Sequence, residues 1–464
     1  MVKKIATSII TVAVLMGSLV ACSGSDSELA ELREELENVK EQLEDSLEPE
    51  ETSEQVLVES EQQLEIEKSA NASTTSTPEA IVESVPNEVP TNSTPEAIVE
   101  SVPIEIVLPI CEISTDDSIP IEERKFDELY DRYHCFLDQL LAISESEELP
   151  PMEVSELKEL LGWPEDTCKT PIVTIEKSPY QTTPSGNVFT IDGEVQCETG
   201  LLIPISGLLG IPLVSVSSGF LVTVPGSASS PERIFGLEIA TYDAIDYAHG
   251  FARRAMEDGF VVFSPRVLDD ILLDPVSAYN SRRGEIDRRA QVLGNRLHGI
   301  ELLALSNTIT ELQKNPEIAG LKIGVYGISL GGSIAFWLGA VNQDIDAVVS
   351  SQWVEERTDK LAGRNNPWSM WRFEYSDYTI LSDAAIRLKD ERVAQLIHPR
   401  PLLLEYGDQD VRAVDVLPVW EELIDLYPPG SEDEGRLSLV IEPGGHEIFY
   451  DKAIDFLKLW LTSD

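Results

Sequence analysis

Basic residues are scarce in this chain of 464 residues. It has 34 Lys and Arg against 83 Asp and Glu, which gives a formal net charge of −49 at pH 7. Nearly half of that charge lies between residues 26 and 117, where the only bases are Arg33, Lys40 and Lys68. Such a surface repels phosphate backbones and anionic lipid headgroups. The composition therefore argues against nucleic acid and anionic lipid as partners.

Long apolar runs are also few. The first extends from Ile5 to Ala21 and follows two lysines. It is short for a membrane span, and it contains four Ser or Thr residues. It ends in "LVAC", which predicts a signal peptide over 1–21 and a lipoprotein processing site; the alternative is a transmembrane anchor. The pattern resembles bacterial lipoproteins, in which Cys22 becomes the lipidated first residue. We expect an extracytoplasmic protein, lipid-anchored to a bacterial membrane.

Cysteine is the third scarce residue. Apart from Cys22 there are four, at 111, 135, 168 and 197, and they form no CxxC pair with a flanking His, which argues against a zinc site. Four cysteines allow three disulfide pairings. We favour the arrangement that joins neighbours, with one disulfide between 111 and 135 and another between 168 and 197, because a secreted chain gains stability by linking its less regular part.

Residues 22–120 read as an acidic stalk. Leu29, Leu32, Leu36, Val39 and Leu43 alternate three and four residues apart, which predicts either self-association of residues 28–47 as a short coiled coil or a single solvated helix. The segment "STPEAIVESVP" occurs at 76–86 and again at 93–103, and a Pro-punctuated acidic repeat of this kind builds no core. Residues 121–170 then show helical spacing and are expected to pack on the main domain.

Residues 171–464 alternate apolar runs with amphipathic helices. Strands that are apolar along their length and separated by helices predict a mostly parallel sheet covered by helices on both faces. The expected parallel strands lie near 219–226, 260–265, 321–327, 345–351, 401–407 and 437–444, with an antiparallel edge from 171–176, 187–191 and 211–218. The expected helices lie near 242–258, 295–313, 329 onward, 383–397, 414–427 and 448–461.

One turn carries the motif on which function depends. In "KIGVYGISLGG" a β run meets a helix at Ser329, and "GISLG" fits the GxSxG nucleophile elbow. The glycines at 327 and 331 leave room for so sharp a turn. We expect the Ser329 hydroxyl to project above the sheet and the amide of Leu330 to face the oxyanion that forms during the reaction. The alternative is a Gly-rich turn without chemistry.

A serine nucleophile needs a histidine base and a carboxylate that orients it. Only two of the five histidines follow Ser329. His446 lies in the loop "PGGH" after the last strand and is the predicted base, whereas His398 precedes its strand and is expected to be a structural or surface residue. His134, His249 and His298 fall in expected helices, where helix-face packing is the better interpretation. The acid follows the preceding strand in "YGDQD", where we favour Asp410 and keep Asp408 as the alternative.

These motifs, in the order Ser, Asp, His, resemble the α/β-hydrolase superfamily over residues 211–461. The similarity is greatest to its dienelactone-hydrolase-like and acetyl-xylan-esterase-like branch, through "YAHGFARRAMEDGFVVFSP" and the elbow segment. Dienelactone hydrolases have Cys at the elbow, so Ser329 favours ordinary ester hydrolysis. The "HG" that usually follows the third strand is here Pro225-Gly226, so either Ser227 or Ala228 would donate the second amide of the oxyanion hole.

Two further segments have open roles. The aromatic-rich stretch 354–378, together with Trp353, fits a substrate pocket or the packing of a small cap. Arg282, Arg283, Arg288 and Arg289 fit either an anionic substrate or, as we favour, salt bridges.

The resemblance and the motifs together imply a serine-dependent carboxylic-ester hydrolase that needs no cofactor or metal. Its substrate would be a small-molecule or glycan ester. A peptidase similar to the prolyl-oligopeptidase hydrolase domain and a non-catalytic surface binding protein are the alternatives.

Overall fold

The computed structural model describes residues 131–140, 142, 149–164, 167–213, 218–227, 229–237, 247–268, 282–362, 384–410, 412–428 and 435–462. The expected signal peptide, Cys22, the repeats and the segment 28–47 lie outside these residues, so the predictions made for them remain predictions. No helix within the described ranges is both long and apolar enough to span a membrane.

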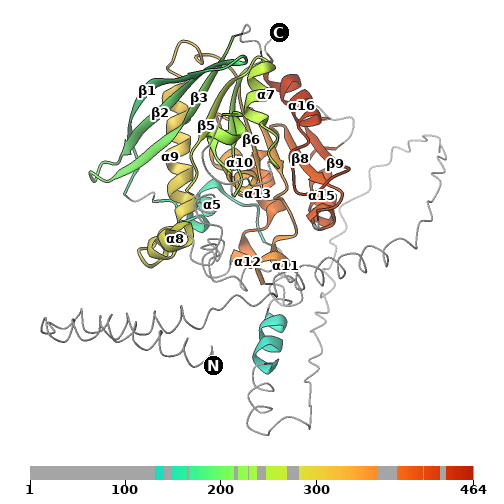
Figure 1. The fold of residues 1–464 in the computed structure, drawn as a ribbon. Helices are drawn as coiled ribbons and strands as arrows, with labels where there is room; N and C mark the ends of the chain where they lie inside the picture. The colour runs from blue at the N-terminus through green and yellow to red at the C-terminus, as the bar shows by residue number, and fades with distance from the viewer. Residues whose placement is uncertain are drawn as a thin grey trace, which may run out of the picture. The chain divides into compact units, whose positions relative to one another are not determined.

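A sheet of nine strands in the order β1-β2-β3-β5-β4-β6-β7-β8-β9 is the framework of residues 172–442 (Figure 1). Neighbours from β5 to β9 pair in parallel, while β1, β2, β3 and β5 pair antiparallel. The expected mostly parallel sheet with an antiparallel edge is confirmed. The strands are β1 Ile172–Thr182, β2 Gly186–Gln196, β3 Leu202–Pro212, β4 Phe220–Val224, β5 Val261–Pro265, β6 Ile323–Ile328, β7 Ala347–Ser351, β8 Leu402–Gly407 and β9 Leu437–Glu442.

The third edge strand differs from the expectation. It was predicted at 211–218, where the apolar residues alternate, but β3 ends at Pro212 and pairs with β2 along its length. The sequence of β3, "LIPISGLLGIP", contains Pro and Gly, which argue against a strand when the sequence is read alone. Gly210 is needed there, because a Cβ at this position would lie 2.6 Å from the Phe235 ring.

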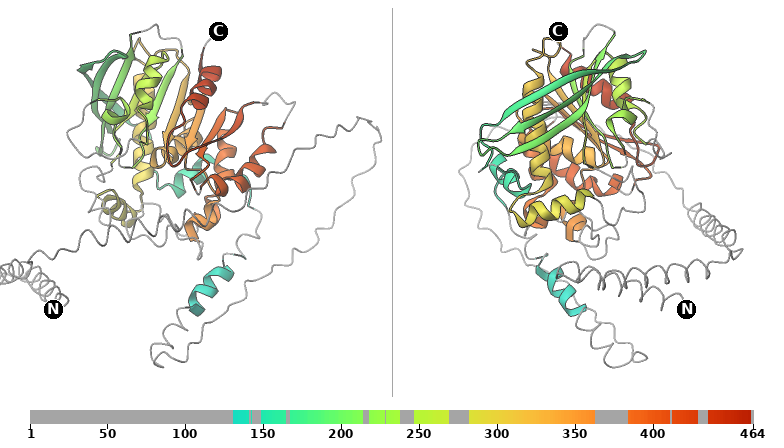
Figure 2. Two further views of the ribbon diagram at one scale, coloured as in Figure 1. Left: turned by 45° about the vertical axis from the view of Figure 1, so that its right-hand side comes forward. Right: turned by 60° about the vertical axis from the view of Figure 1, so that its left-hand side comes forward.

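Helices cover both faces of the sheet (Figure 2). The side chains of the strands divide between two cores. Phe220, Val222 and Val224 of β4 face the first core, and Leu221 faces the second, as the two-residue period of a strand requires. The first core contains α5 Val154–Leu160, α9 Leu297–Leu312, α10 Leu330–Val341, α13 Asp390–Ile397 and α15 Leu417–Ile424. The second contains α6 Pro231–Ile234, α7 Phe251–Glu257 and α16 Asp451–Leu461.

Two of the expected helices are each divided into two. In place of one helix over 383–397, α12 Ala384–Arg387 ends before α13, and Asp390 at the start of α13 pairs with Arg357 of α11 Arg357–Ala362. In place of one over 414–427, α14 Arg412–Asp415 precedes α15. Pro418 stands in the first turn of α15, where its missing N–H is tolerated. The helix α8 is Arg282–Val292.

The segment before β1 is attached to the domain by ion pairs and a disulfide. Glu156 of α5 pairs with Arg387 and Arg392 at 3.2 Å each. Cys168 is bonded to Cys197, as expected, whereas Cys111 lies outside the described residues and its pairing with Cys135 remains a prediction. The helix at 131–140 differs from α5 in its burial, because four of its apolar side chains are exposed: Tyr133, Phe136, Leu137 and Leu140.

Candidate active site

Ser329 stands at the sharp turn between β6 and α10. Its backbone has φ 57° and ψ −120°, a conformation that costs energy for a residue with a side chain. The Ser329 amide donates to the carbonyl of Ser351 at the end of β7 (2.9 Å), and its carbonyl accepts from the amide of Ser333 (3.0 Å). Ser329 therefore has the strained strand-to-helix geometry of a nucleophile elbow. Leu330, the first residue of α10, has an amide without a partner inside the helix.

The chain after β4 passes close to this turn. A Cβ built on Gly226 would lie 3.2 Å from Cβ of Ser329 and 2.7 Å from the carbonyl oxygen of Ile328. Only glycine permits this approach, which brings the backbone at Gly226 and Ser227 beside Ser329. Ser227 is half-buried, and Ala228, the alternative amide donor, lies outside the described residues.

His446 and Asp410 are brought together at the ends of β9 and β8. Nδ1 of His446 lies 2.5 Å from Oδ2 of Asp410. Asp410 is 8% exposed, and its other oxygen accepts from the amide of Arg412 (3.0 Å). The pair can therefore hold the imidazole in one orientation with Nε2 free for proton transfer. No hydrogen bond between the described side chains joins Ser329 to His446, which is common before substrate binds.

Asp408 makes a different contact. Its Oδ1 accepts from the amide of Gly444 at 3.0 Å, while its own amide donates to the carbonyl of Glu442 (2.8 Å). Asp408 thus holds the start of the loop that carries His446 but does not touch the imidazole. Of the two acids left open by the sequence, Asp410 is the one at hydrogen-bond distance from His446.

Arg412 adds a positive charge beside the Asp410 carboxylate. Its Nη1 lies 3.2 and 3.3 Å from the two carboxylate oxygens and 3.3 Å from Nδ1 of His446. Burial by itself raises the pKa of Asp410, but the hydrogen bond from His446 and the charge of Arg412 outweigh it and bring the pKa to about 2. Asp410 is therefore ionised at any pH at which the site would work.

The loop that carries His446 is fixed from two sides. The side-chain amide of Gln352, a fully buried residue directly after β7, donates to the carbonyls of Gly445 (3.2 Å) and Glu447 (3.0 Å). On the other side, Glu447 accepts from the amide of Gly445 (3.1 Å) and pairs with Nε2 of His249 (2.6 Å). These bonds hold the backbone on both sides of the imidazole.

Tyr247 lies beside the candidate site and links two of its parts. Its hydroxyl donates to the carbonyl of Ser227, and its carbonyl accepts from the amide of Ile448 (2.9 Å). The centre of its ring is 6.0 Å from that of His446. Tyr247 therefore couples the loop after β4 to the loop after β9.

A buried carboxyl lies in the sheet near these loops. Glu405 of β8 is fully buried and accepts from the hydroxyl of Tyr326 at 2.9 Å. Burial raises the pKa of Glu405 to about 7, against the opposing effect of its hydrogen bonds. The backbone carbonyl of Glu405 accepts from the amide of Gln352 (2.9 Å).

The other histidines divide between packing and the edge of the site. His298 is buried in α9 against the ring of Trp337 (4.9 Å), and His398 ends α13 with its ring against Tyr427 (4.8 Å), so both are structural as expected. His134 lies in the helix at 131–140. The prediction for His249 is wrong: it lies in a turn before α7, with φ 50°, and pairs with Glu447.

The two segments with open roles are only partly described. Trp353 is 4% exposed and packs against Trp337, whereas residues 363–383, which hold the other five aromatic side chains of that stretch, lie outside the described residues. Arg283 is buried and forms a salt bridge with Glu301 (2.8 Å), which is the role favoured for this group. Arg288 and Arg289 are exposed on α8.

Sequence reasoning did not identify Gln352, Tyr247 or Arg412. Gln352 carried a usable signal, since it directly follows a parallel strand at the edge where Ser329 and His446 were expected. Tyr247 and Arg412 carried none, because their contacts depend on the paths of loops.

Comparison with known proteins supports the architecture. A model of the family BAAT / acyl-CoA thioester hydrolase C terminal matches residues 301–368, which include Ser329. No curated protein matches the chain.

Solved structures resemble the chain at low sequence identity. A protein from Bacteroides fragilis assigned as an acetyl xylan esterase has 14% identity and a TM-score of 0.50, covering 70% of this chain and 84% of its own. Acetyl xylan esterase 1 from Thermoanaerobacterium has 15% identity and a TM-score of 0.40, with coverage of 67% and 99%. A glucuronoyl esterase from Solibacter usitatus has 14% identity and a TM-score of 0.44, with coverage of 66% and 90%. The chain has the α/β-hydrolase fold.

Proposed function

We propose that the chain is a serine-dependent hydrolase of carboxylic esters, with Ser329 as nucleophile, His446 as base and Asp410 as the acid that orients it. The observation that carries the proposal is the 2.5 Å contact between His446 and Asp410 at the same sheet edge as the strained turn of Ser329. Chemistry, rather than packing alone, explains a strained serine at the same edge of the sheet as such a pair.

In the proposed reaction, His446 takes the proton of the Ser329 hydroxyl as its oxygen attacks the ester carbonyl. The tetrahedral intermediate collapses to an acyl-enzyme when His446 returns that proton to the leaving alcohol. Water then attacks the acyl carbon as His446 takes its proton, and the second intermediate collapses when His446 returns that proton to the Ser329 oxygen and the carboxylic acid leaves. Asp410, ionised because its pKa is about 2, stabilises the imidazolium that forms in each half.

The oxyanion would be bound by the backbone amides of Leu330 and Ser227. The first is supported by its position at the start of α10, and the second by the approach of Gly226 to Ser329. Tyr247 acts here as a positioning residue, since its hydroxyl bonds the carbonyl of Ser227.

The location and attachment of the enzyme are part of the proposal. Cys22 would be lipidated and hold the protein outside the cytoplasm, at a bacterial membrane, with residues 22–120 as the stalk. Residues 28–47 would allow self-association. A carboxylic ester of a small molecule or of a glycan, such as an acetylated sugar, would be the substrate.

Hydrolysis of p-nitrophenyl esters of increasing chain length, and of acetylated xylan, tests the reaction. The wild-type chain should release p-nitrophenol, and Ser329→Ala should abolish it. Ser333→Ala is the matched control, because the Ser333 hydroxyl is buried on the same helix and bonds the Leu330 carbonyl (2.6 Å). Absence of ester turnover by folded wild-type protein would reject the proposal, and cleavage of peptides in its place would favour a peptidase.

A further inference from the structure

The strand β9 has a backbone edge that no other described strand covers. Within the described part of the chain β9 pairs with β8 alone (Figure 1). The amides of Leu402 and Asp408 donate to the carbonyls of Arg436 and Glu442, at 2.8 Å each. Because backbone groups alternate in direction along a strand, three residues of β9 point their amides and carbonyls away from β8: Leu437, Leu439 and Ile441. No hydrogen bond joins these outward groups to a residue that the structure describes.

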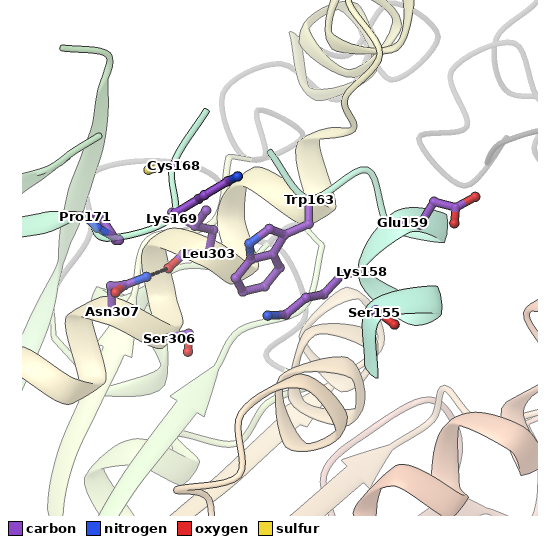
Figure 3. Close-up of a pocket in the computed structure, with 10 residues that line it drawn as sticks. All are labelled: Ser155, Lys158, Glu159, Trp163, Cys168, Lys169, Pro171, Leu303, Ser306 and Asn307. Carbon is purple, nitrogen blue, oxygen red and sulfur yellow. Dashed lines mark hydrogen bonds between the residues drawn. The ribbon is translucent and has the colours of Figure 1, made fainter. Parts of the chain in front are cut away.

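The opposite edge of the sheet, β1, has features that oppose pairing with a further strand. Lysine, proline and bulges protect sheet edges. β1 contains Lys177 and Pro179, and its pairing with β2 shifts register after Pro179. The segment that leads into β1, with Lys169 and Pro171, lines a cavity of about 740 Å³ beside α9 (Figure 3), so the surface there is hollow. The sequence of β9, "LSLVIE", has no lysine or proline, and its ladder with β8 is unbroken. β9 is therefore the edge that a further strand can join.

A second copy of β9 fits this edge in one register. When two β9 strands run antiparallel about a two-fold axis at Leu439, Leu437 of each copy faces Ile441 of the other, and Leu439 faces its own counterpart. These are the residues with outward groups, and each such pair exchanges two N–H···O bonds. An axis at Ile441 would place Pro443, which has no N–H, opposite Leu439. An axis at Leu437 would pair Leu439 with Gly435, which precedes the strand.

The side chains are complementary in the same register. Leu437 and Leu439 are half-buried against the first core, whereas Ile441, on the same face of the strand, is 42% exposed. Leu437 of the second copy would cover it. On the other face Arg436 would lie opposite Glu442 of the second copy, where opposite charges stabilise a pair of strands. Glu442 is half-buried and forms no salt bridge with a described residue.

Arg436 is held beside β9 before any second copy arrives. Its Nη1 donates to the carbonyl of Pro399 (2.8 Å), and its guanidinium lies over the ring of Trp460 on α16, 5.4 Å from the ring centre. A side chain that is already positioned loses less conformational entropy when it forms an ion pair across an interface.

We propose that two copies of this chain associate through β9, antiparallel about a two-fold axis at Leu439, so that their two nine-stranded sheets join into one. The carboxyl ends of the strands then point in opposite directions in the two copies, and the two candidate active sites lie at opposite edges of the joined sheet. The inference rests on the fold and does not depend on the proposed hydrolase activity. It is also separate from self-association of residues 28–47, since its contacts come from β9.

Hydrogen exchange of the full chain, measured by mass spectrometry on peptides that cover residues 436–442, tests the pairing at the strand itself. At about 1 mM protein the outward amides of β9 should be protected, and Glu442→Arg, which places two arginines opposite each other, should speed their exchange by about tenfold or more. Glu176→Arg is the matched control, because it makes the same charge change at an exposed position of β1. It should leave the exchange of β9 unchanged.

The double variant Arg436→Glu with Glu442→Arg should restore protection. The two positions lie about 20 Å apart along one strand, at about 3.3 Å per residue, so they can pair only between copies. Thermal unfolding shows whether each variant is folded. If the double variant is less stable than wild type, Leu439→Pro replaces it, because it removes the central outward N–H and leaves the bonds to β8 in place. Leu439→Pro should then lose the protection of Leu437 and Ile441.

Four outcomes would overturn the proposal. The first is rapid exchange of the outward amides in wild type at about 1 mM, since an association too weak to protect them there contributes less than about 4 kcal/mol. The second is unchanged exchange in Glu442→Arg. The third is a stable double variant without restored protection, and the fourth is full protection in Leu439→Pro.

Discussion

Nδ1 of His446 lies 2.5 Å from Oδ2 of Asp410, although the two residues are 36 positions apart and follow different strands. Replacing Asp410 with Asn removes the charge that stabilises the imidazolium and permits the wrong tautomer, so kcat should fall by about 10³ to 10⁴. Asp408→Asn is the control. It weakens a bond to the Gly444 amide but leaves the imidazole partner intact, and kcat should stay within about tenfold of wild type. A larger loss in Asp408→Asn than in Asp410→Asn would contradict this assignment of the acid.

Gln352 is expected to act as a positioning residue for His446. Gln352→Ala removes two hydrogen bonds to the loop carbonyls of Gly445 and Glu447 and leaves a cavity at a buried site, so kcat should fall by about tenfold, and the melting temperature should fall as well. Gln343→Ala is the matched control, since Gln343 is exposed and its side chain donates to the Ala340 carbonyl of its own helix region. If kcat is unchanged in Gln352→Ala while stability falls, the role of Gln352 is purely structural.

Tyr247→Phe removes a single hydroxyl and keeps the ring. The lost bond to the Ser227 carbonyl frees the backbone that would bind the oxyanion, and we expect a three- to tenfold fall in kcat, from a bond contribution of about 0.5–1.5 kcal/mol. Tyr450→Phe serves as control, because its hydroxyl bonds Asp258 (2.7 Å) away from Ser329. Steady-state kinetics of both variants should show the kcat loss in Tyr247→Phe only; equal losses would speak against the positioning role.

The raised pKa of Glu405 leads us to expect that stability depends on pH. Its pKa is raised from 4.5 to about 7 on folding, so between these values the folded state holds a proton that the unfolded state has released. The free energy of unfolding should therefore decrease as the pH rises from 4.5 to 7, by about 3 kcal/mol from this group. Urea unfolding across this range should show a smaller decrease in Glu405→Gln than in wild type. Part of the decrease should remain, because burial also raises the pKa of Glu391 to about 7. An identical slope in Glu405→Gln would contradict the prediction.

The parallel half of the fold was predictable because its strands are apolar along their length. Runs such as 321–327 and 401–407 have no other stable environment than a sheet covered on both faces. The strand β3 was misplaced because its glycines serve close packing, which no local pattern reveals. The break between α12 and α13 was not predictable either, since Asp390 at the start of α13 has its buried partner, Arg357, on a different helix.

The motif residues of the candidate site were predictable, but the residues that position them were not. Ser329 and His446 follow β6 and β9, whose carboxyl ends lie at one edge of the sheet with β7 and β8 between them, so the topology predicts the shared edge and the loop after β9 must cover the remaining distance. Asp408 and Asp410 are two residues apart after the same strand, and only the path of the loop decides which reaches His446. Gln352 and Tyr247 act through contacts between loops that are distant in the sequence.

Labelling with a fluorophosphonate, followed by peptide mapping, tests the central claim most directly. The reagent reacts with a serine that a neighbouring base activates, and it requires no knowledge of the substrate. The triad predicts one adduct, on Ser329, which is absent in Ser329→Ala and strongly reduced in His446→Ala. No adduct on folded wild-type protein, or an adduct that persists at another serine in Ser329→Ala, would contradict the assignment of Ser329 as the nucleophile.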